Sequence, residues 1–132
     1  MANKALGTKE QLEYLKKNGI PLSPAIRYGN LIFVSGQPPV DLKSGVLISG
    51  DIEKQTEQVM ENLKITLESS GSSLNKVLKT TIYATNAGFY DQINKVYARY
   101  FNDSKPARTF VTVGSFNTGF DIEIDCIAFV ED

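Results

Sequence analysis

Arg108 and Glu123 are the two charged residues of this sequence best placed to do chemistry. Arg108 follows Pro106-Ala107 and opens a predicted strand, so its backbone should be well fixed. A guanidinium in such a position can hold a carboxylate through two parallel hydrogen bonds. Glu123 lies inside the predicted last strand, where burial would raise the pKa of its carboxyl group and let it take a proton from water. Each residue also has a plainer interpretation, as a surface ion pair and as a solvated strand glutamate.

Three further residues could line a site beside this pair. Ser35 and Gly36 end a predicted strand, and a backbone without a Cβ can be approached closely by a ligand. Asn94 lies in a predicted helix and could point into a site. The alternative interpretation of Ser35 and Gly36 is a simple turn, and that of Asn94 is an exposed amide. Cys126, the only cysteine, falls on an apolar strand face, where a thiol is expected to fill the core rather than act as a nucleophile.

The composition excludes several mechanisms, because the sequence contains no histidine. Ser-His-Asp and Cys-His catalysis are impossible. A single cysteine without histidine cannot supply the usual zinc ligand sets, so no metal is expected. The formal net charge of −1 offers no obvious basic face for a nucleic acid. Residues 1–7 lack the apolar segment of a signal peptide, and no apolar run is long enough to span a membrane, which predicts a cytoplasmic protein.

Hydrophobic periodicity and turn residues predict a chain of alternating strands and helices. A capping box, Thr8 to Gln11, begins a short helix that Gly19 ends. Gly29-Asn30 suits the positive φ angles of a tight hairpin turn. In chain order the sequence further predicts strands 25–28 and 31–35, a helix 51–69, a strand 77–84, a helix of about 88–101, and strands 108–113 and 121–130. No repeat or internal boundary interrupts them, so residues 1–132 are expected to form one domain with residues 1–19 as a helical N-terminal extension.

The last predicted strand suggests that the chain associates with copies of itself. Its alternate residues Ile122, Ile124, Cys126, Ala128 and Val130 form an entirely apolar face, which should lie under the two longer helices. The other face mixes three carboxylates with Ile127 and Phe129, and this mixture would sit poorly in water. A second subunit covering this face would resolve the problem. We therefore expect a homo-oligomer with cavities between its subunits.

The combined motifs of the sequence resemble those of the Rid (reactive intermediate deaminase, YjgF-like) family from about Pro21 to the C-terminus. They comprise Gly29 to Asp41 (GNLIFVSGQPPVD), Gln55-Thr56, Asn62-Leu63, Val77 to Thr81, Phe89 through Asn94 to Tyr97, Tyr100-Phe101, Pro106-Ala107-Arg108 and Ile122 to Ala128. The resemblance implies a chorismate-mutase-like α+β fold, with a mixed sheet and two long helices on one face. It also implies a homotrimer with active sites in the clefts between subunits.

The resemblance further implies roles and a reaction. Arg108 would bind the substrate carboxylate, Glu123 would position or activate water, and Asn94, Ser35 and Gly36 would line the pocket. The reaction is the hydrolysis of 2-iminopropanoate or 2-iminobutanoate to the 2-oxo acid and ammonia. A protonated imine is already electrophilic, so the protein need only hold the carboxylate, place a water and move a proton. No cofactor is implied.

One departure from the family pattern leaves other functions open. Rid deaminases commonly carry Gly-Pro-Tyr-Ser near the start, whereas this chain reads Ile20-Pro21-Leu22-Ser23, so Leu22 replaces a tyrosine hydroxyl. A regulatory trimer that binds small carboxylates without catalysis is therefore an alternative. Ribonuclease or translation-inhibitor activity, a label of some relatives, is disfavoured by the acidic balance and the lack of histidine. Chorismate mutase activity rests on fold analogy alone.

Overall fold

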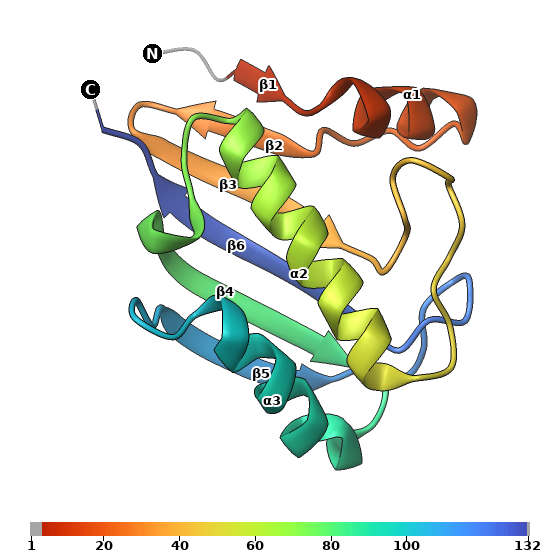
Figure 1. The fold of residues 1–132 in the computed structure, drawn as a ribbon. Helices are drawn as coiled ribbons and strands as arrows, with labels where there is room; N and C mark the ends of the chain where they lie inside the picture. Colours follow the sequence, from red (N-terminus) through yellow and green to blue (C-terminus); the bar gives the residue numbers. More distant parts are fainter. Residues whose placement is uncertain (1–3, 132) are drawn as a thin grey trace.

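One mixed β-sheet organises the computed structural model, which describes residues 4–131 (Figure 1). Within that range its strand order is β1-β2-β3-β6-β4-β5, and only β4 and β5 pair in parallel. The strands are β1 (Lys4–Leu6), β2 (Ala25–Tyr28), β3 (Leu31–Gln37), β4 (Val77–Ala84), β5 (Ala107–Thr112) and β6 (Ile122–Phe129). The helices are α1 (Lys9–Lys17), α2 (Ile52–Ser69) and α3 (Tyr90–Tyr100), with short 3-10 turns at Leu74–Lys76 and Ala87–Phe89.

Helices α2 and α3 lie side by side across one face of the sheet, as expected (Figure 1). The alternation predicted for the last strand is confirmed, because Ile122, Ile124 and Ala128 are fully buried beneath these helices. Cys126 lies in the same row, and burial raises the pKa of its thiol to about 12. A thiol that stays protonated is a core residue rather than a nucleophile. The mixed α+β fold expected from the family resemblance is therefore confirmed.

The N-terminal segment differs from the expected purely helical extension, because Lys4–Leu6 form an extra strand. This strand pairs with β2, with Lys4 opposite Arg27. The capping box that follows is confirmed, since Thr8 N donates to Gln11 Oε1 at 2.9 Å and Gln11 N donates to Thr8 Oγ1 at 3.1 Å. Gln11 Nε2 also donates to Thr66 Oγ1 of α2. Helix α1 is therefore tied to α2 by a buried side chain.

Two turns show backbone detail beyond the expected pattern. In the β2–β3 hairpin Gly29 has a φ of 61°, whereas Asn30 has no positive φ. The turn therefore places its left-handed residue first, where glycine is required. A β-bulge interrupts β3, because Val34 pairs with Cys126 but Gln37 pairs with Ile124. Bulges re-aim side chains and occur often beside functional sites.

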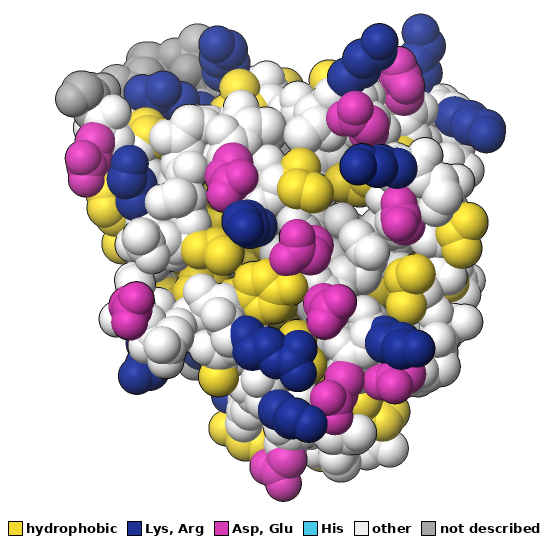
Figure 2. Space-filling view, viewed as in Figure 1, with side chains coloured by type: hydrophobic (Ala, Val, Ile, Leu, Met, Phe, Trp, Pro, Cys, Tyr) yellow, Lys and Arg dark blue, Asp and Glu magenta, His cyan; other side chains and the backbone are white. Residues whose placement is uncertain are grey.

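The helix-bearing face carries charges of both signs. Figure 2 shows Lys and Arg side chains interspersed with Asp and Glu across this view. Lys95 and Arg99 of α3 lie 3.5 Å from Glu53 and Glu57 of α2, respectively. No basic patch of the kind that binds a phosphate backbone stands out on this face. Among the described residues, no helix is long and apolar enough to cross a membrane.

The opposite face of the sheet is not covered by a helix of the described chain. Large apolar side chains are exposed there, including Phe33 at 42%, Leu31 at 38% and Val111 at 37%. They share the face with Asp125, whose Oδ2 accepts a hydrogen bond from Tyr83 Oη at 2.9 Å. The mixture of exposed apolar and acidic groups agrees with the pattern read from the sequence of β6. We call this surface the open sheet face.

Candidate functional site

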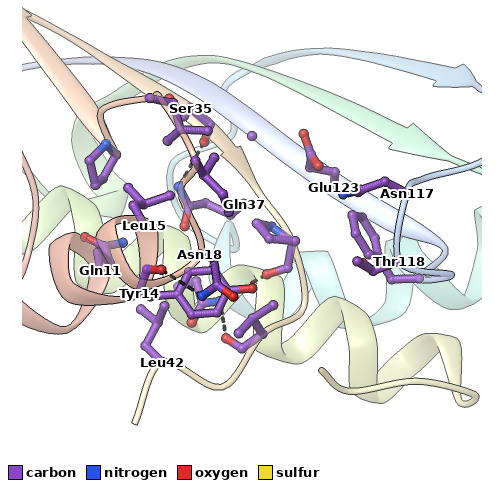
Figure 3. A pocket seen from close by; sticks show the side chains of 18 residues that line it. Gln11, Tyr14, Leu15, Asn18, Ser35, Gln37, Leu42, Asn117, Thr118 and Glu123 are labelled. Carbon is purple, nitrogen blue, oxygen red and sulfur yellow. Dashed lines mark hydrogen bonds between the residues drawn. The ribbon is translucent and has the colours of Figure 1, made fainter. Parts of the chain in front are cut away.

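A cavity of about 670 Å³ lies between α1, the bulged end of β3 and the loop that precedes β6 (Figure 3). Glu123, Ser35 and Gly36, three of the residues predicted from the sequence, all line it. Figure 3 shows Glu123 on the side of the loop residues Asn117 and Thr118, with Ser35 and Gln37 between this group and α1. The cavity is therefore the first candidate site.

Gly36 and Glu123 lie in direct contact at this cavity. A Cβ built on Gly36 would lie only 2.7 Å from Glu123 Cδ, closer than real Cβ atoms approach their neighbours. The bulge holds this backbone in place, since Ser35 N donates to Pro24 O at 3.0 Å and Ser35 Oγ donates to Ser23 O at 2.6 Å. The glycine therefore makes room for the carboxylate.

The Glu123 carboxyl group has the properties of a general acid or base. Burial raises its pKa above the ordinary value, and the nearby Asp125 carboxylate raises it further. Within residues 4–131 no side chain donates a hydrogen bond to it. A carboxyl group that is partly desolvated and free of an internal partner can accept a proton from a bound water.

Arg108 lies elsewhere, at the edge strand β5 against α3. Its guanidinium Cζ is 5.0 Å from the ring centroid of Tyr97 and 5.5 Å from that of Tyr90. Nη2 donates a hydrogen bond to Tyr90 Oη at 3.1 Å. Tyr97 is itself fixed by a 2.7 Å hydrogen bond between its hydroxyl and Thr80 Oγ1. The two rings thus hold the cation by their π faces and leave most of its donors available.

Asn94 belongs to the same cluster as Arg108. Residues 90, 94 and 97 follow one stripe of α3, because side chains three and four apart are neighbours on a helix. Among the described residues, Asn94 Oδ1 is buried without a hydrogen-bond partner. Buried acceptors are nearly always satisfied, so this oxygen needs a donor from outside the chain described. The sequence indicated Asn94 but not Tyr90 or Tyr97 as site residues; their helical spacing with Asn94 was the available signal.

The single chain does not bring Arg108 and Glu123 together. Arg108 pairs in register with Thr80, which pairs with Cys126 on the helix-bearing face. Glu123 is three residues from Cys126 along β6, and alternation places it on the opposite face. The cavity thus holds Glu123, Ser35 and Gly36, while the β5 edge holds Arg108 and Asn94. Among residues 4–131 no cluster of three His, Cys, Asp or Glu side chains could hold a metal ion.

Comparison with known proteins relates the chain to one family. The family model described as Endoribonuclease L-PSP matches residues 17–130. A RutC family protein of Pyrococcus horikoshii is 47% identical over 111 residues, which cover 84% of this chain and 88% of the relative. The chloroplastic Reactive Intermediate Deaminase A of Arabidopsis thaliana is 38% identical over 108 residues, covering 82% of this chain and 58% of that protein.

Solved structures agree with this relation. The Rid family protein YyfA of Yersinia pestis superposes with a TM-score of 0.88 at 36% identity, covering 98% of this chain and all of that one. TdcF of Escherichia coli, solved with bound serine, gives a TM-score of 0.79 at 28% identity over 84% of this chain and 89% of TdcF. The matched region leaves most of α1 outside the family model.

Proposed function

Since the chain belongs to the Endoribonuclease L-PSP family, the family of the Rid and YjgF proteins, we propose that it hydrolyses reactive 2-imino acids such as 2-iminobutanoate and 2-iminopropanoate. The observation that carries the proposal is the Glu123 carboxyl group, which lies on Gly36 at the cavity with a raised pKa. Support comes from a relative named as a reactive intermediate deaminase and from a structural neighbour solved with a small amino acid.

The proposed chemistry uses only side chains that this protein itself supplies. Arg108 holds the substrate carboxylate, and Asn94 Oδ1 accepts a hydrogen bond from the iminium nitrogen or a water beside it. Glu123 takes a proton from water as the water oxygen attacks the iminium carbon, and the C=N double bond becomes a C–N single bond. Glu123 then returns the proton to nitrogen. The C–N bond breaks as the C=O bond forms, and the hydroxyl proton passes through Glu123 to the departing ammonia, so the products are a 2-oxo acid and ammonium.

This mechanism requires two chains, because Arg108 and Glu123 project from opposite faces of one sheet. We place each site between protomers of a homotrimer, in which the open sheet face is covered and Arg108 of one copy reaches the cavity of the next. Asn94 Oδ1 would gain its missing donor there. We assign the enzyme to the cytoplasm, together with the pyridoxal-phosphate dehydratases that release such imines.

Placing a charge on the open sheet face should disrupt this assembly. Phe33→Asp puts a carboxylate where an exposed phenyl ring would be buried between copies. We expect mainly monomers by light scattering and a loss of deaminase activity. The matched control is Ile65→Asp, because Ile65 of α2 is equally exposed, at 40%, on the other side of the molecule. A trimer that survives Phe33→Asp would contradict the proposed interface.

The contact of Gly36 with Glu123 gives a sharper local prediction. Gly36→Ala should displace the carboxylate and lower kcat/KM by at least about tenfold, because a misplacement of about 1 Å costs this much or more. Gly114→Ala is the control, since a Cβ at Gly114 meets nothing within 4 Å and its φ is not positive. Imine hydrolysis by the two purified variants checks this, and equal activities would remove Gly36 from the site.

A coupled assay tests the function itself. Threonine dehydratase converts threonine to the four-carbon imine, and added protein should accelerate the release of 2-oxobutanoate over buffer. No acceleration would reject the deaminase; binding of 2-oxobutanoate without acceleration would favour the regulatory trimer that Leu22 suggests. The family description also warrants an RNA-cleavage assay on the purified protein. Cleavage that Arg108→Ala abolishes would replace the deaminase with a ribonuclease.

A further inference from the structure

The cavity beside Glu123 is larger than a four-carbon imino acid needs. Its volume of about 670 Å³ lies in the range of sites for drug-sized ligands. Glu123 and the Ser35-Gly36 bulge occupy one side, whereas Leu15 and Tyr14 of α1 stand on the other side (Figure 3). If the reacting carbon is held near Glu123, space remains between it and α1 for the rest of the substrate.

The wall on the α1 side combines the polar side chains of Gln11, Tyr14, Asn18 and Asn62 with a larger set of apolar ones. The apolar ones are Leu15, Ile20, Leu22, Pro24, Val40 and Leu42. Among the described residues that line the cavity, Glu123 is the only charged one. In the proposed trimer the neighbouring copy's Arg108 holds the first carboxylate, so no cation of this lining is left to hold a second one, and the acidic side chain would repel it.

The two buried amides in this wall are already satisfied. Gln11 uses its oxygen for Thr8 N and its nitrogen for Thr66 Oγ1. Asn62 Nδ2 donates to Pro38 O at 3.1 Å and to Val40 O at 2.8 Å, and Asn62 Oδ1 accepts from Gln58 at 2.9 Å. These amides need no polar group from a ligand, so they leave the apolar side chains to decide what fits.

The same bonds fix the wall in position. Gln11, only 4% exposed, joins α1 to α2, and Asn62 joins α2 to the strand-end loop. Helix α1 lies mostly outside the region that matches the family model, which begins at residue 17. Of the six apolar wall residues, Leu15 lies outside the matched region and the other five lie within it.

We infer that α1 and Leu22 form a side-chain subsite, and that this chain prefers 2-imino acids with long, uncharged, apolar side chains over the two smallest ones. The inference rests on the proposed function for the position of the reacting carbon. Each methylene placed against such a wall contributes about a fourfold gain in affinity. An isobutyl side chain in place of a methyl group should therefore gain at least about tenfold.

Binding of stable 2-oxo acids tests the subsite independently of catalysis. Calorimetry on the full-length protein should show 4-methyl-2-oxopentanoate binding at least about tenfold more tightly than pyruvate. Leu15→Trp fills the subsite and should remove most of this difference while changing the pyruvate affinity less than about twofold. Leu22→Trp should do the same, and because Leu22 is 49% exposed its substitution leaves the fold intact. Leu12→Trp is the matched control, since Leu12 lies on α1, is 50% exposed and does not line the cavity.

The outcomes separate this inference from the proposed function. Equal affinity for the two acids, equal effects of the Leu12 and Leu15 variants, or no binding of either acid would overturn the subsite. The same proteins are then assayed with imines made by an amino acid oxidase from alanine and leucine. Selective binding without hydrolysis would overturn the deaminase and keep the subsite. Hydrolysis of both imines at equal kcat/KM would overturn the subsite and keep the deaminase.

Discussion

Arg108→Ala is expected to lower kcat/KM for 2-iminobutanoate by at least about a hundredfold. Two charge-assisted hydrogen bonds to a carboxylate are lost together, and each contributes about 1.5–3 kcal/mol. Arg108→Lys should recover only part of the loss, because an ammonium group keeps the charge without the planar pair of donors. Steady-state imine hydrolysis by the three proteins measures the effect.

The control for this substitution is an arginine of α3 itself. Arg99→Ala removes a half-exposed guanidinium that forms a salt bridge with Glu57 of α2 at 3.5 Å. Surface ion pairs of this kind contribute little, so activity and thermal stability should change only slightly. Activity that survives Arg108→Ala, or that falls as far in Arg99→Ala, would exclude Arg108 as the carboxylate-binding group.

Mixed trimers test whether the two charged residues come from different chains. Arg108→Ala and Glu123→Gln are each expected to be inactive alone. In trimers assembled at random from the two variants, each site takes Arg108 from one chain and Glu123 from its neighbour. The site is intact when the first chain is the Glu123→Gln variant, which keeps Arg108, and the neighbour is the Arg108→Ala variant, which keeps Glu123. About a quarter of the sites meet this condition, so coexpression should restore about a quarter of the activity. No restoration would mean that one chain supplies both residues or neither.

The elements that the sequence predicted well are those with a strong local pattern. The alternation of β6 and the helical period of α2 survive in the structure because both elements bury their apolar residues in one core. Strand β1 was missed because three residues carry no period, and their state is decided by pairing with β2. The bulge in β3 depends on register against β6, which no property of residues 31–37 alone reveals.

The candidate site was predicted in its residue types but not in its arrangement. Ser35, Gly36 and Glu123 lie together because β3 and β6 are sheet neighbours, although nearly 90 residues separate them in sequence. The placement of Arg108 on the other face follows from its pairing with Thr80, which the sequence does not encode locally. The contribution of α1 to the cavity wall likewise depends on the tertiary contact of Gln11 with Thr66.

Glu123→Gln is expected to abolish hydrolysis, and the wild-type pH profile is expected to show an acidic limb set by Glu123. The wild-type base must be ionised to accept a proton from water, and burial together with Asp125 raises its pKa. The kcat/KM of the wild type should therefore rise with pH through a pKa above that of an ordinary glutamate, then level off. Asp125→Asn removes the neighbouring charge, the second cause of the raised Glu123 pKa, and should move this limb to lower pH. An unchanged limb in Asp125→Asn would assign it to another group.

The same raised pKa fixes the sign of a stability change. A carboxyl group that binds its proton more tightly in the folded state stabilises the protein fully below its unfolded pKa, and this contribution is lost as the pH rises through the folded pKa. Above the folded pKa of Glu123 the wild type carries a partly buried charge, whereas a glutamine is neutral at every pH. Glu123→Gln should thus unfold at a higher temperature than the wild type at about pH 8, and the difference should shrink toward about pH 4. Thermal unfolding followed by circular dichroism at both pH values measures it. A variant that is less stable than the wild type at the higher pH would mean that the ionised carboxylate is held by a favourable partner in the folded protein, and a carboxylate so held would be a poor base.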